Sequence, residues 1–469
     1  MKEVSKNFIY NVCYQVLALI LPLITIPYVS RVLGSSGIGE YSYTYSIVYY
    51  FMIFAMLGLN NYGNRTIAQV RDDREKLSKT FKEIHLLQVI TSTIMIALYV
   101  IFAFFINKEY KDITVIQTIY IVSCVFDINW FFFGIEKFKL TVTRNTIIKL
   151  ISMCLIFILV KNKSDVWIYT LILSGSTLLS QLLLWPFVYK YTDRVKASIK
   201  DIRKHIMPNL KLFLTVIAVV IYKVMDKTMI GVFSNVSEVG FYENAEKIIN
   251  VPTVIIAALG TVMLPRMSNL YVKGEERKSK LIIEKSMNAM MFAGFPMVLG
   301  LVAISSNFTT VFLGTAFSKT AILISMLAVT SLFISWGNVL RSQFLIPRER
   351  DREYVISAFL GAAVNLICNI IFIPKFASIG ACIGTILAEL IVIVYQSYVV
   401  RKELPIKKYL IDVIPFFVKS VIMFAIIYPI NYLNLKYGFL IQVFVGAMIY
   451  MILNIKYINY FINEIKKRR

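Results

Sequence analysis

The chain alternates long apolar blocks with short polar segments. One block, WIYTLILSGSTLLSQLLLWPFVY at 167–189, contains no Asp, Glu, Lys or Arg. A helix that crosses a bilayer needs roughly 20 such residues. We therefore predict an all-α polytopic membrane protein with about fourteen spans, at 8–30, 38–60, 83–106, 113–133, 143–160, 166–188, 208–233, 241–264, 282–304, 320–340, 353–373, 379–400, 409–430 and 438–460.

Composition and charge agree with this reading. Only 16% of the residues are charged, against about 25% in soluble domains. The net charge of +23 comes from short clusters between apolar blocks, which favours topogenic charge over nucleic-acid binding. With the N-terminus in the cytoplasm, most Lys and Arg fall on cytoplasmic segments, and an even number of spans puts both termini there. The outside segments hold Arg31, Lys108, Lys111, Lys161, Lys163, Lys319, Lys375 and Lys436.

The two halves of the chain resemble each other. RVLGSSGIGEYSYTYSI from Arg31 matches GVFSNVSEVGFYENAEKI from Gly231, which aligns Gly39 with Gly240. At the same offset of 201 residues, 65–79 matches 266–280. We predict two parallel six-helix repeats around a central cavity, an N-terminal lobe at 1–206 and a C-terminal lobe at 207–402, followed by two additional helices at 403–469.

Ionisable residues interrupt predicted spans seven and eight. Each charge at the centre of a span costs about 2.5–3.5 kcal/mol, so these groups either pair between helices or line a water-filled cavity. We expect Lys223 to be the main contact for an anionic substrate, with Lys227 and Lys247 in support. Glu243 is nearest the outer end and is expected to be solvated. The complete set is Lys223, Asp226, Lys227, Glu243, Glu246 and Lys247, and its acids are candidates for ion coupling or pairing.

Other candidate chemistry is sparse. Tyr41, Tyr45 and Tyr49 share one helical face, and they either belong to an interfacial aromatic belt or stack on sugars. The five cysteines show no CxxC spacing and the two histidines lie far apart, so we expect no metal and no cofactor. The outside loops are too short to hold a glycan polymerase site. We therefore expect a transport protein and no enzyme.

Several segments resemble a known family. PYVSRVLGSSGIGEYSY at 27–43, DINWFFFGIEKFKLTVTRN at 127–145 and MDKTMIGVFSNVSEVGFYENAEKI at 225–248 are similar to segments of polysaccharide repeat-unit flippases of the Wzx type. These belong to the multidrug/oligosaccharidyl-lipid/polysaccharide exporter superfamily. The similarity runs through nearly the whole chain in order.

The resemblance implies a flippase that moves undecaprenyl-pyrophosphate-linked oligosaccharide units to the outer leaflet by alternating access, for capsule, O-antigen or exopolysaccharide assembly. It implies a bacterial cytoplasmic membrane, lipid contact, and work beside a polysaccharide polymerase and chain-length machinery. Lys227 and Arg31 match family positions, whereas the case for Lys223 and Lys247 is physical. Relatives are suggested to couple transport to H⁺ or Na⁺, but the shared motifs do not identify the coupling residues. The alternative is a cation-coupled multidrug or small-molecule exporter of the same superfamily, which usually has twelve spans.

Overall fold

The computed structural model describes residues 2–196, 198–433 and 435–459. Within these ranges it leaves out the side chains of 2–20, 199, 214–216, 218–223, 254–259, 261 and 262. Every regular element in the described ranges is a helix. The predicted all-α class is therefore confirmed.

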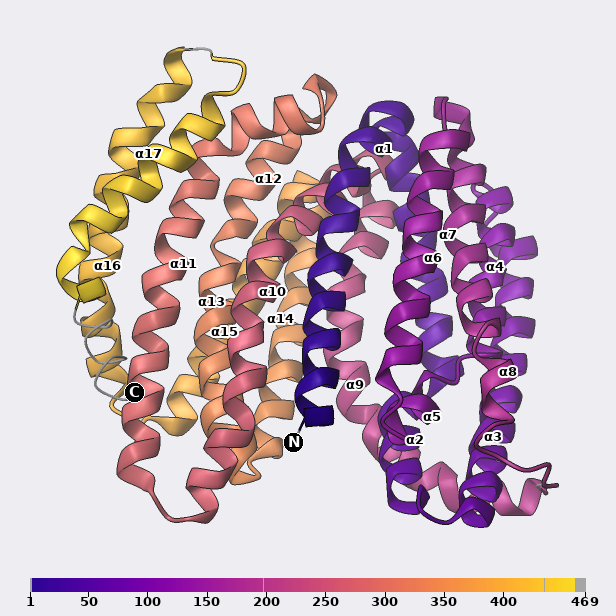
Figure 1. Cartoon of the computed structure of the whole chain (residues 1–469). Coiled ribbons are helices and arrows are strands. Elements are labelled where there is room, and N and C mark those ends of the chain that lie inside the picture. Colours follow the sequence, from indigo (N-terminus) through magenta and orange to yellow (C-terminus); the bar gives the residue numbers. More distant parts are fainter. Residues whose placement is uncertain (1, 197, 434, 460–469) are drawn as a thin grey trace. The chain divides into compact units, whose positions relative to one another are not determined.

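The chain divides into two compact units, and unit 1 covers Met1–Gly240. Figure 1 shows α4, α6 and α7 side by side in this unit, where α7 packs against both others. The helices of unit 1 are α1 (Lys2–Met56), α2 (Leu59–Val70), α3 (Arg74–Ile101), α4 (Lys111–Val125), α5 (Asn129–Gly134), α6 (Phe138–Leu159), α7 (Val166–Leu182), α8 (Trp185–Val188), α9 (Ile199–Phe233) and the start of α10 (Val236–Val272).

Unit 2 covers Phe241–Arg469. In it α16 and α17 pack against α11 and against each other, as Figure 1 also shows. Its helices after α10 are α11 (Glu276–Phe312), α12 (Ser318–Ala328), α13 (Thr330–Leu340), the π-helical turn η4 (Arg341–Leu345), α14 (Asp351–Phe376), α15 (Ser378–Val400), α16 (Ile406–Ile427) and α17 (Gly438–Leu453).

The first two predicted spans form one long helix with an internal break. Gly34 has φ 68° and ψ −178° in the middle of α1. A residue with a Cβ rarely adopts a positive φ, whereas glycine does so at little cost. The break lies between the predicted spans 8–30 and 38–60, and it lets the two parts of α1 take different directions. α2 follows after a second interruption at Leu57 and Gly58, which also have positive φ.

Several helices extend beyond the predicted spans: α3 begins at Arg74 where the prediction is 83, and α9 also begins early. The predicted span begins at 208, but α9 begins at Ile199. Ser198 forms a capping box there: its Oγ accepts from the backbone N–H of Lys200 at 3.4 Å, and the Asp201 carboxylate accepts from the backbone N–H of Ser198 at 3.0 Å. Such caps satisfy N–H groups that have no partner inside the helix.

Ten helical segments of the described residues are long and apolar enough to cross a membrane, and α17 is a shorter apolar helix. The chain is therefore a multi-pass membrane protein. The total of fourteen spans stays a prediction. The lobe boundaries at 206 and 402 stay predictions as well. They derive from the internal sequence repeat, whereas the two compact units are defined by contacts between residues.

The WFFFG run of the segment 127–145, which carries part of the family resemblance, packs against α2 in unit 1. α5 contains the WFFFG run, and the Trp130 side chain is fully buried and donates to Gln88 Oε1 at 3.0 Å. A Cβ at Gly63 of α2 would come within 2.6 Å of the Trp130 ring, and one at Gly134 within 2.6 Å of Ile67. The glycines thus permit α2 and α5 to meet closely, which gives these motif residues a packing role.

Candidate functional site

The charged residues of predicted span seven lie in the last third of α9. Asp226 is buried, with 3% of its surface exposed, and the next residue, Lys227, is half-buried. Both stand in a helix that is otherwise largely apolar there. The Lys223 side chain lies outside the described residues, so the predicted main contact for an anion stays a prediction. A buried carboxylate beside a half-buried ammonium is a costly arrangement in a membrane, which marks this part of α9 as a candidate site.

The predicted tyrosine face runs along α1 and reaches this site at one end. The rings of Tyr41 and Tyr45 stack at 5.7 Å, and those of Tyr45 and Tyr49 lie 5.8 Å apart. Tyr41 is buried, and its hydroxyl lies 2.8 Å from that of Tyr120 in α4. Tyr49 lies close enough to Lys227 for an electrostatic interaction. Tyr41 therefore packs inside unit 1, and Tyr49 lies within electrostatic range of Lys227 in α9.

The sequence did not predict a pair of hydroxyl groups that lies next to Lys227. Ser46 of α1 is fully buried, and its Oγ lies 2.7 Å from Thr228 Oγ1 of α9. Thr228 also donates toward the hydroxyl of Tyr50 at 3.5 Å. Hydroxyls in apolar helices are common, so the sequence held no clear signal for this contact. The pair joins α1 to α9 directly beside Lys227.

Arg31 lies elsewhere on α1. It is solvent-exposed and stands three residues before the break at Gly34. The structure therefore places Arg31 and Tyr49, eighteen residues apart along α1, on opposite sides of that break. A role for Arg31 in holding an anion stays a prediction.

The charges of predicted span eight lie in the first turns of α10 that belong to unit 2. Lys247 Nζ forms an ion pair with Glu243 Oε1 at 3.0 Å. Glu243 is buried, so the expectation that it would be solvated is wrong. Residues four apart share one helical face. In α10 Glu243 and Lys247 lie on such a face, and the Glu243 side chain is buried there beside the Lys247 ammonium. Glu246 is half-buried one turn from Tyr242, whose hydroxyl lies 3.0 Å from Thr385 Oγ1 of α15.

The repeat-related glycines Gly39 and Gly240 meet within unit 1. A Cβ at Gly39 would overlap the carbonyl oxygen of Val236, and one at Gly240 would overlap that of Ser35. The same hypothetical Cβ atoms would stand 3.0 Å from the amide nitrogen of Gly240 and 3.1 Å from that of Gly39. The contact is reciprocal at the 201-residue offset of the repeat. Helices related by a two-fold axis give such a pattern where they cross.

The described residues contain no group of three or more His, Cys, Asp or Glu side chains that could hold a metal ion. The side chains described at the candidate site supply charges, hydroxyls and aromatic rings in an apolar surrounding. Such a set can bind and release a polar or anionic ligand. The residue types in α9 and α1 suit noncovalent recognition.

Comparison with known proteins identifies the family. The model of the family described as "Polysaccharide biosynthesis protein" matches residues 4–271. The chain belongs to this family. Among similar proteins is a "Putative O-antigen transporter" of Escherichia coli (strain K12), 23% identical over 86% of this chain and 97% of that protein. A "Probable low-salt glycan biosynthesis flippase Agl15" of Haloferax volcanii is 24% identical over 59% of each chain.

Solved structures share the fold of this family member. "Lipid II flippase MurJ, inward closed conformation" matches with a TM-score of 0.78 and 17% identity, over 97% of this chain and all of that one. An outward-facing multidrug resistance MATE family transporter of the MOP superfamily matches with a TM-score of 0.56 and 14% identity, over 85% of this chain and 94% of its own. At these identities the likeness concerns the fold, and it agrees with the superfamily that the sequence motifs indicate.

Proposed function

We propose that this protein is a flippase that carries undecaprenyl-pyrophosphate-linked oligosaccharide units from the inner to the outer leaflet of a bacterial cytoplasmic membrane. The observation that carries this proposal is the buried Asp226 and half-buried Lys227 in α9, within the predicted span 208–233, of a polysaccharide biosynthesis family member. Charge within a span is costly and usually serves function. A lipid-linked diphosphate is an anion that must cross the apolar layer, and it needs a cation on its way.

The proposed roles follow the chemistry of such a substrate. Lys227, with Lys223, binds the diphosphate, and Arg31 holds it near the outer end. Tyr45 and Tyr49 offer ring faces and hydroxyls to sugars, while the polyprenyl tail stays in lipid. Lys247 has a smaller part than the sequence predicts, because its charge is already balanced by Glu243 at 3.0 Å. Translocation makes and breaks no covalent bond, so no residue is given a catalytic role.

The cell biology of the proposal has three parts. Both termini lie in the cytoplasm. The transported units feed capsule, O-antigen or another exopolysaccharide, with a polymerase and chain-length machinery as partners. H⁺ or Na⁺ drives the cycle, and Asp226, Glu243 and Glu246 are the acids that respond to it.

Transfer of a fluorescent undecaprenyl-pyrophosphate oligosaccharide across proteoliposomes tests the proposal. A charge-assisted contact to phosphate contributes roughly 1.5–3 kcal/mol, so Lys227→Ala and Lys223→Ala should each lower transfer about 10- to 150-fold. Lys227→Arg should keep most activity. Lys163→Ala, at an exposed lysine at the predicted outer end of the same unit, is the matched control.

Two results would count against the proposal. If Lys223 serves only to pair with Asp226, the double variant Lys223→Ala/Asp226→Ala should recover full transfer, which would remove the diphosphate role. If the protein is a multidrug exporter, the wild-type protein should move cationic dyes across the same vesicles and leave the lipid-linked oligosaccharide in place.

A further inference from the structure

A buried acid lies at one end of unit 1, away from the site described above. Glu83 of α3 has none of its surface exposed. Its Oε2 lies 2.9 Å from Nε2 of His205, and Nζ of Lys204 lies 3.0 Å from Oε1 and 2.8 Å from Oε2. The other ring nitrogen of His205, Nδ1, lies 2.6 Å from the hydroxyl of Tyr62. A chain of phenol, imidazole, carboxylate and ammonium therefore connects α2, α3 and α9.

This chain can hold His205 in either protonation state. In the neutral ring, Nε2–H donates to Glu83, and Nδ1 accepts from the Tyr62 hydroxyl. In the protonated ring both nitrogens donate, and the Tyr62 oxygen accepts, since a phenol serves as donor or acceptor. A proton from water can therefore add to Nδ1 without displacing a side chain. Lys204, whose side chain is 59% exposed, lies on the same carboxylate and opens the cluster to solvent.

We propose that Tyr62, Glu83 and His205 form a proton-binding site that holds the start of α9 against α2 and α3. A buried carboxylate needs a cationic partner, and removing that partner is strongly destabilising. The exposed Lys204 ammonium is screened by water, whereas a protonated His205 ring would be buried beside Glu83. Proton binding therefore strengthens the attachment of α9. By linkage, a proton that binds more tightly to the attached state shifts the equilibrium toward it as the pH falls.

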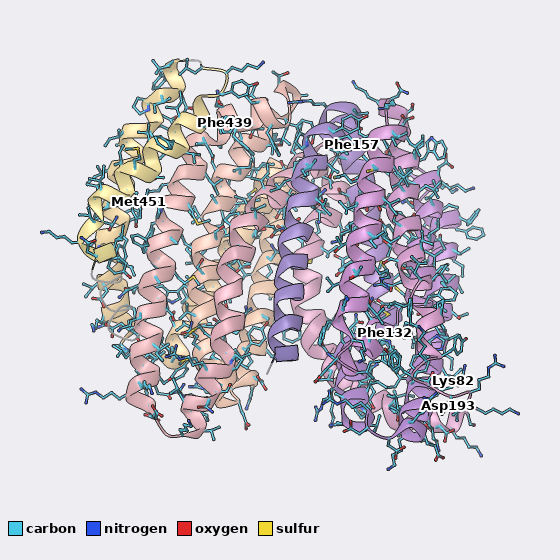
Figure 2. The ribbon with its side chains drawn as sticks, viewed as in Figure 1. Lys82, Phe132, Phe157, Asp193, Phe439 and Met451 are labelled. Atoms are coloured by element: carbon cyan, nitrogen blue, oxygen red, sulfur yellow. The ribbon has the colours of Figure 1, made fainter. Side chains whose placement is uncertain are left out.

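Several charged groups lie near His205 on α9 itself, where Lys200, Arg203 and Lys204 are exposed and Asp201 is half-buried. α2 brings Tyr62, with Arg65 exposed to solvent, and α3 brings Glu83. α1 contributes an apolar contact further along α9, between Phe54 and Phe213 at 5.5 Å. The neighbouring lysines of Glu83 on α3, Lys79 and Lys82, are exposed, and Figure 2 shows Lys82 projecting outward at the end of unit 1. Among these residue types histidine is the one that ordinarily exchanges a proton between pH 5 and 8, so the proposed proton uptake centres on His205.

The position of the cluster gives it a consequence for transport. α9 begins with the residues of the cluster and continues to Asp226 and Lys227. A change in how firmly its first turns are attached acts on the same helix that carries the candidate site. The predicted topology places the cluster at the cytoplasmic ends of the predicted spans 38–60, 83–106 and 208–233, so cytoplasmic protons are the ligand. Proton binding can be measured without any lipid-linked substrate, so a failure here is separate from a failure of the proposed function.

Histidine NMR tests the site directly, because the chain has two histidines, His85 and His205. In full-length protein labelled with ¹⁵N-histidine and carrying His85→Asn, a single imidazole remains. We expect it to change protonation state between pH 5 and 8.5. Backbone amides of 199–207, corrected for intrinsic exchange rates, should exchange about tenfold more slowly at the acid end, where the proposed bound proton holds α9 in place. The two midpoints should coincide.

Variants distinguish proton binding from plain packing. His205→Gln keeps a donor toward Glu83 but takes up no proton, so exchange at 199–207 should lose its pH dependence. Lys408→Gln, at an exposed lysine paired with Glu284 in unit 2, should leave that dependence unchanged. A single protonation state of His205 over the whole range would overturn the site, as would pH-dependent exchange that survives in His205→Gln.

A second variant keeps the test decisive if His205→Gln fails to fold. Tyr62→Phe removes only the partner of Nδ1. It should move the midpoint of His205 by at least half a pH unit, about threefold in proton affinity. An unchanged midpoint in Tyr62→Phe would take Tyr62 out of the site and overturn the proposed three-residue arrangement.

Discussion

Two glutamates at equivalent places in the repeat have different surroundings. Glu83 of α3 and Glu284 of α11 are separated by the 201-residue offset that aligns 65–79 with 266–280. Each pairs with a lysine at the start of a later helix: Glu83 with Lys204 of α9, and Glu284 with Lys408 of α16, both at 2.8 Å. Glu83 is fully buried, but the Glu284 side chain is 27% exposed and that of Lys408 55%.

The difference shows how two glutamates at repeat-related positions can differ in physical character. An exposed ion pair contributes little, because water and salt screen it. A buried carboxylate is tolerated when several donors surround it, and unit 1 supplies the donors through His205 and Lys204. One of these donors is an imidazole, a group that can take up a proton. The same acid is therefore a surface contact in unit 2 and a candidate proton site in unit 1.

The largest predicted effect comes from removing the partners of Glu83. Lys204→Ala/His205→Ala leaves a buried carboxylate without a cation, which should destabilise the protein by about 3–5 kcal/mol. Lys408→Ala should leave the melting temperature within error, because Glu284 reaches solvent. Thermal unfolding of both purified variants in detergent checks this. Equal melting temperatures would show that burial does not distinguish the two glutamates.

A smaller loss of stability is expected at Gly39 and Gly240, where the two repeats have the same residue. Gly39→Ala and Gly240→Ala should each destabilise the observed packing by about 1–3 kcal/mol, since either Cβ overlaps a backbone carbonyl. The two effects should be similar, because the contact is reciprocal. Gly175→Ala in α7 is the matched control, where a Cβ would meet nothing within 4 Å.

Thermal unfolding under one buffer condition compares the three glycine variants. Gly175→Ala should be neutral or slightly stabilising, because alanine loses less backbone entropy than glycine in a helix. A loss at Gly39 without a matching loss at Gly240 would contradict the reciprocal crossing. It would also weaken the alignment of the two repeats.

The smallest effect belongs to an exposed ion pair of unit 1. Arg74 Nη2 lies 2.8 Å from Asp193 Oδ1, and this hydrogen bond holds the pKa of the Asp193 carboxyl below its ordinary value. Its stabilisation is present above the ordinary pKa of an aspartate and is lost as the pH falls through the lowered one. Figure 2 shows Asp193 at the outer edge of unit 1. Arg74→Ala should therefore change the melting temperature little at pH 7 and not at all at pH 2.5.

The sequence by itself determined the helical class, the positions of most helices and the family. Long apolar blocks leave a membrane helix as the stable choice, because backbone groups in lipid must bond within their own segment. The break in α1 is also readable, since polar and glycine residues separate two blocks at 31–37. The charges of α9 and α10 stand out in the sequence because the residues around them are apolar.

Tertiary structure decided which of those charges and rings meet. Tyr41 and Tyr49 share a helical face, yet Tyr41 packs against Tyr120 and Tyr49 lies near Lys227. The sequence predicts a solvated Glu243, but this side chain is buried beside Lys247. Glu83 and His205 are separated by 122 residues, and periodicity carries no information on such pairs. Helix patterns fix what lies on one face of one helix, whereas burial and long-range partners depend on which other helices cover that face.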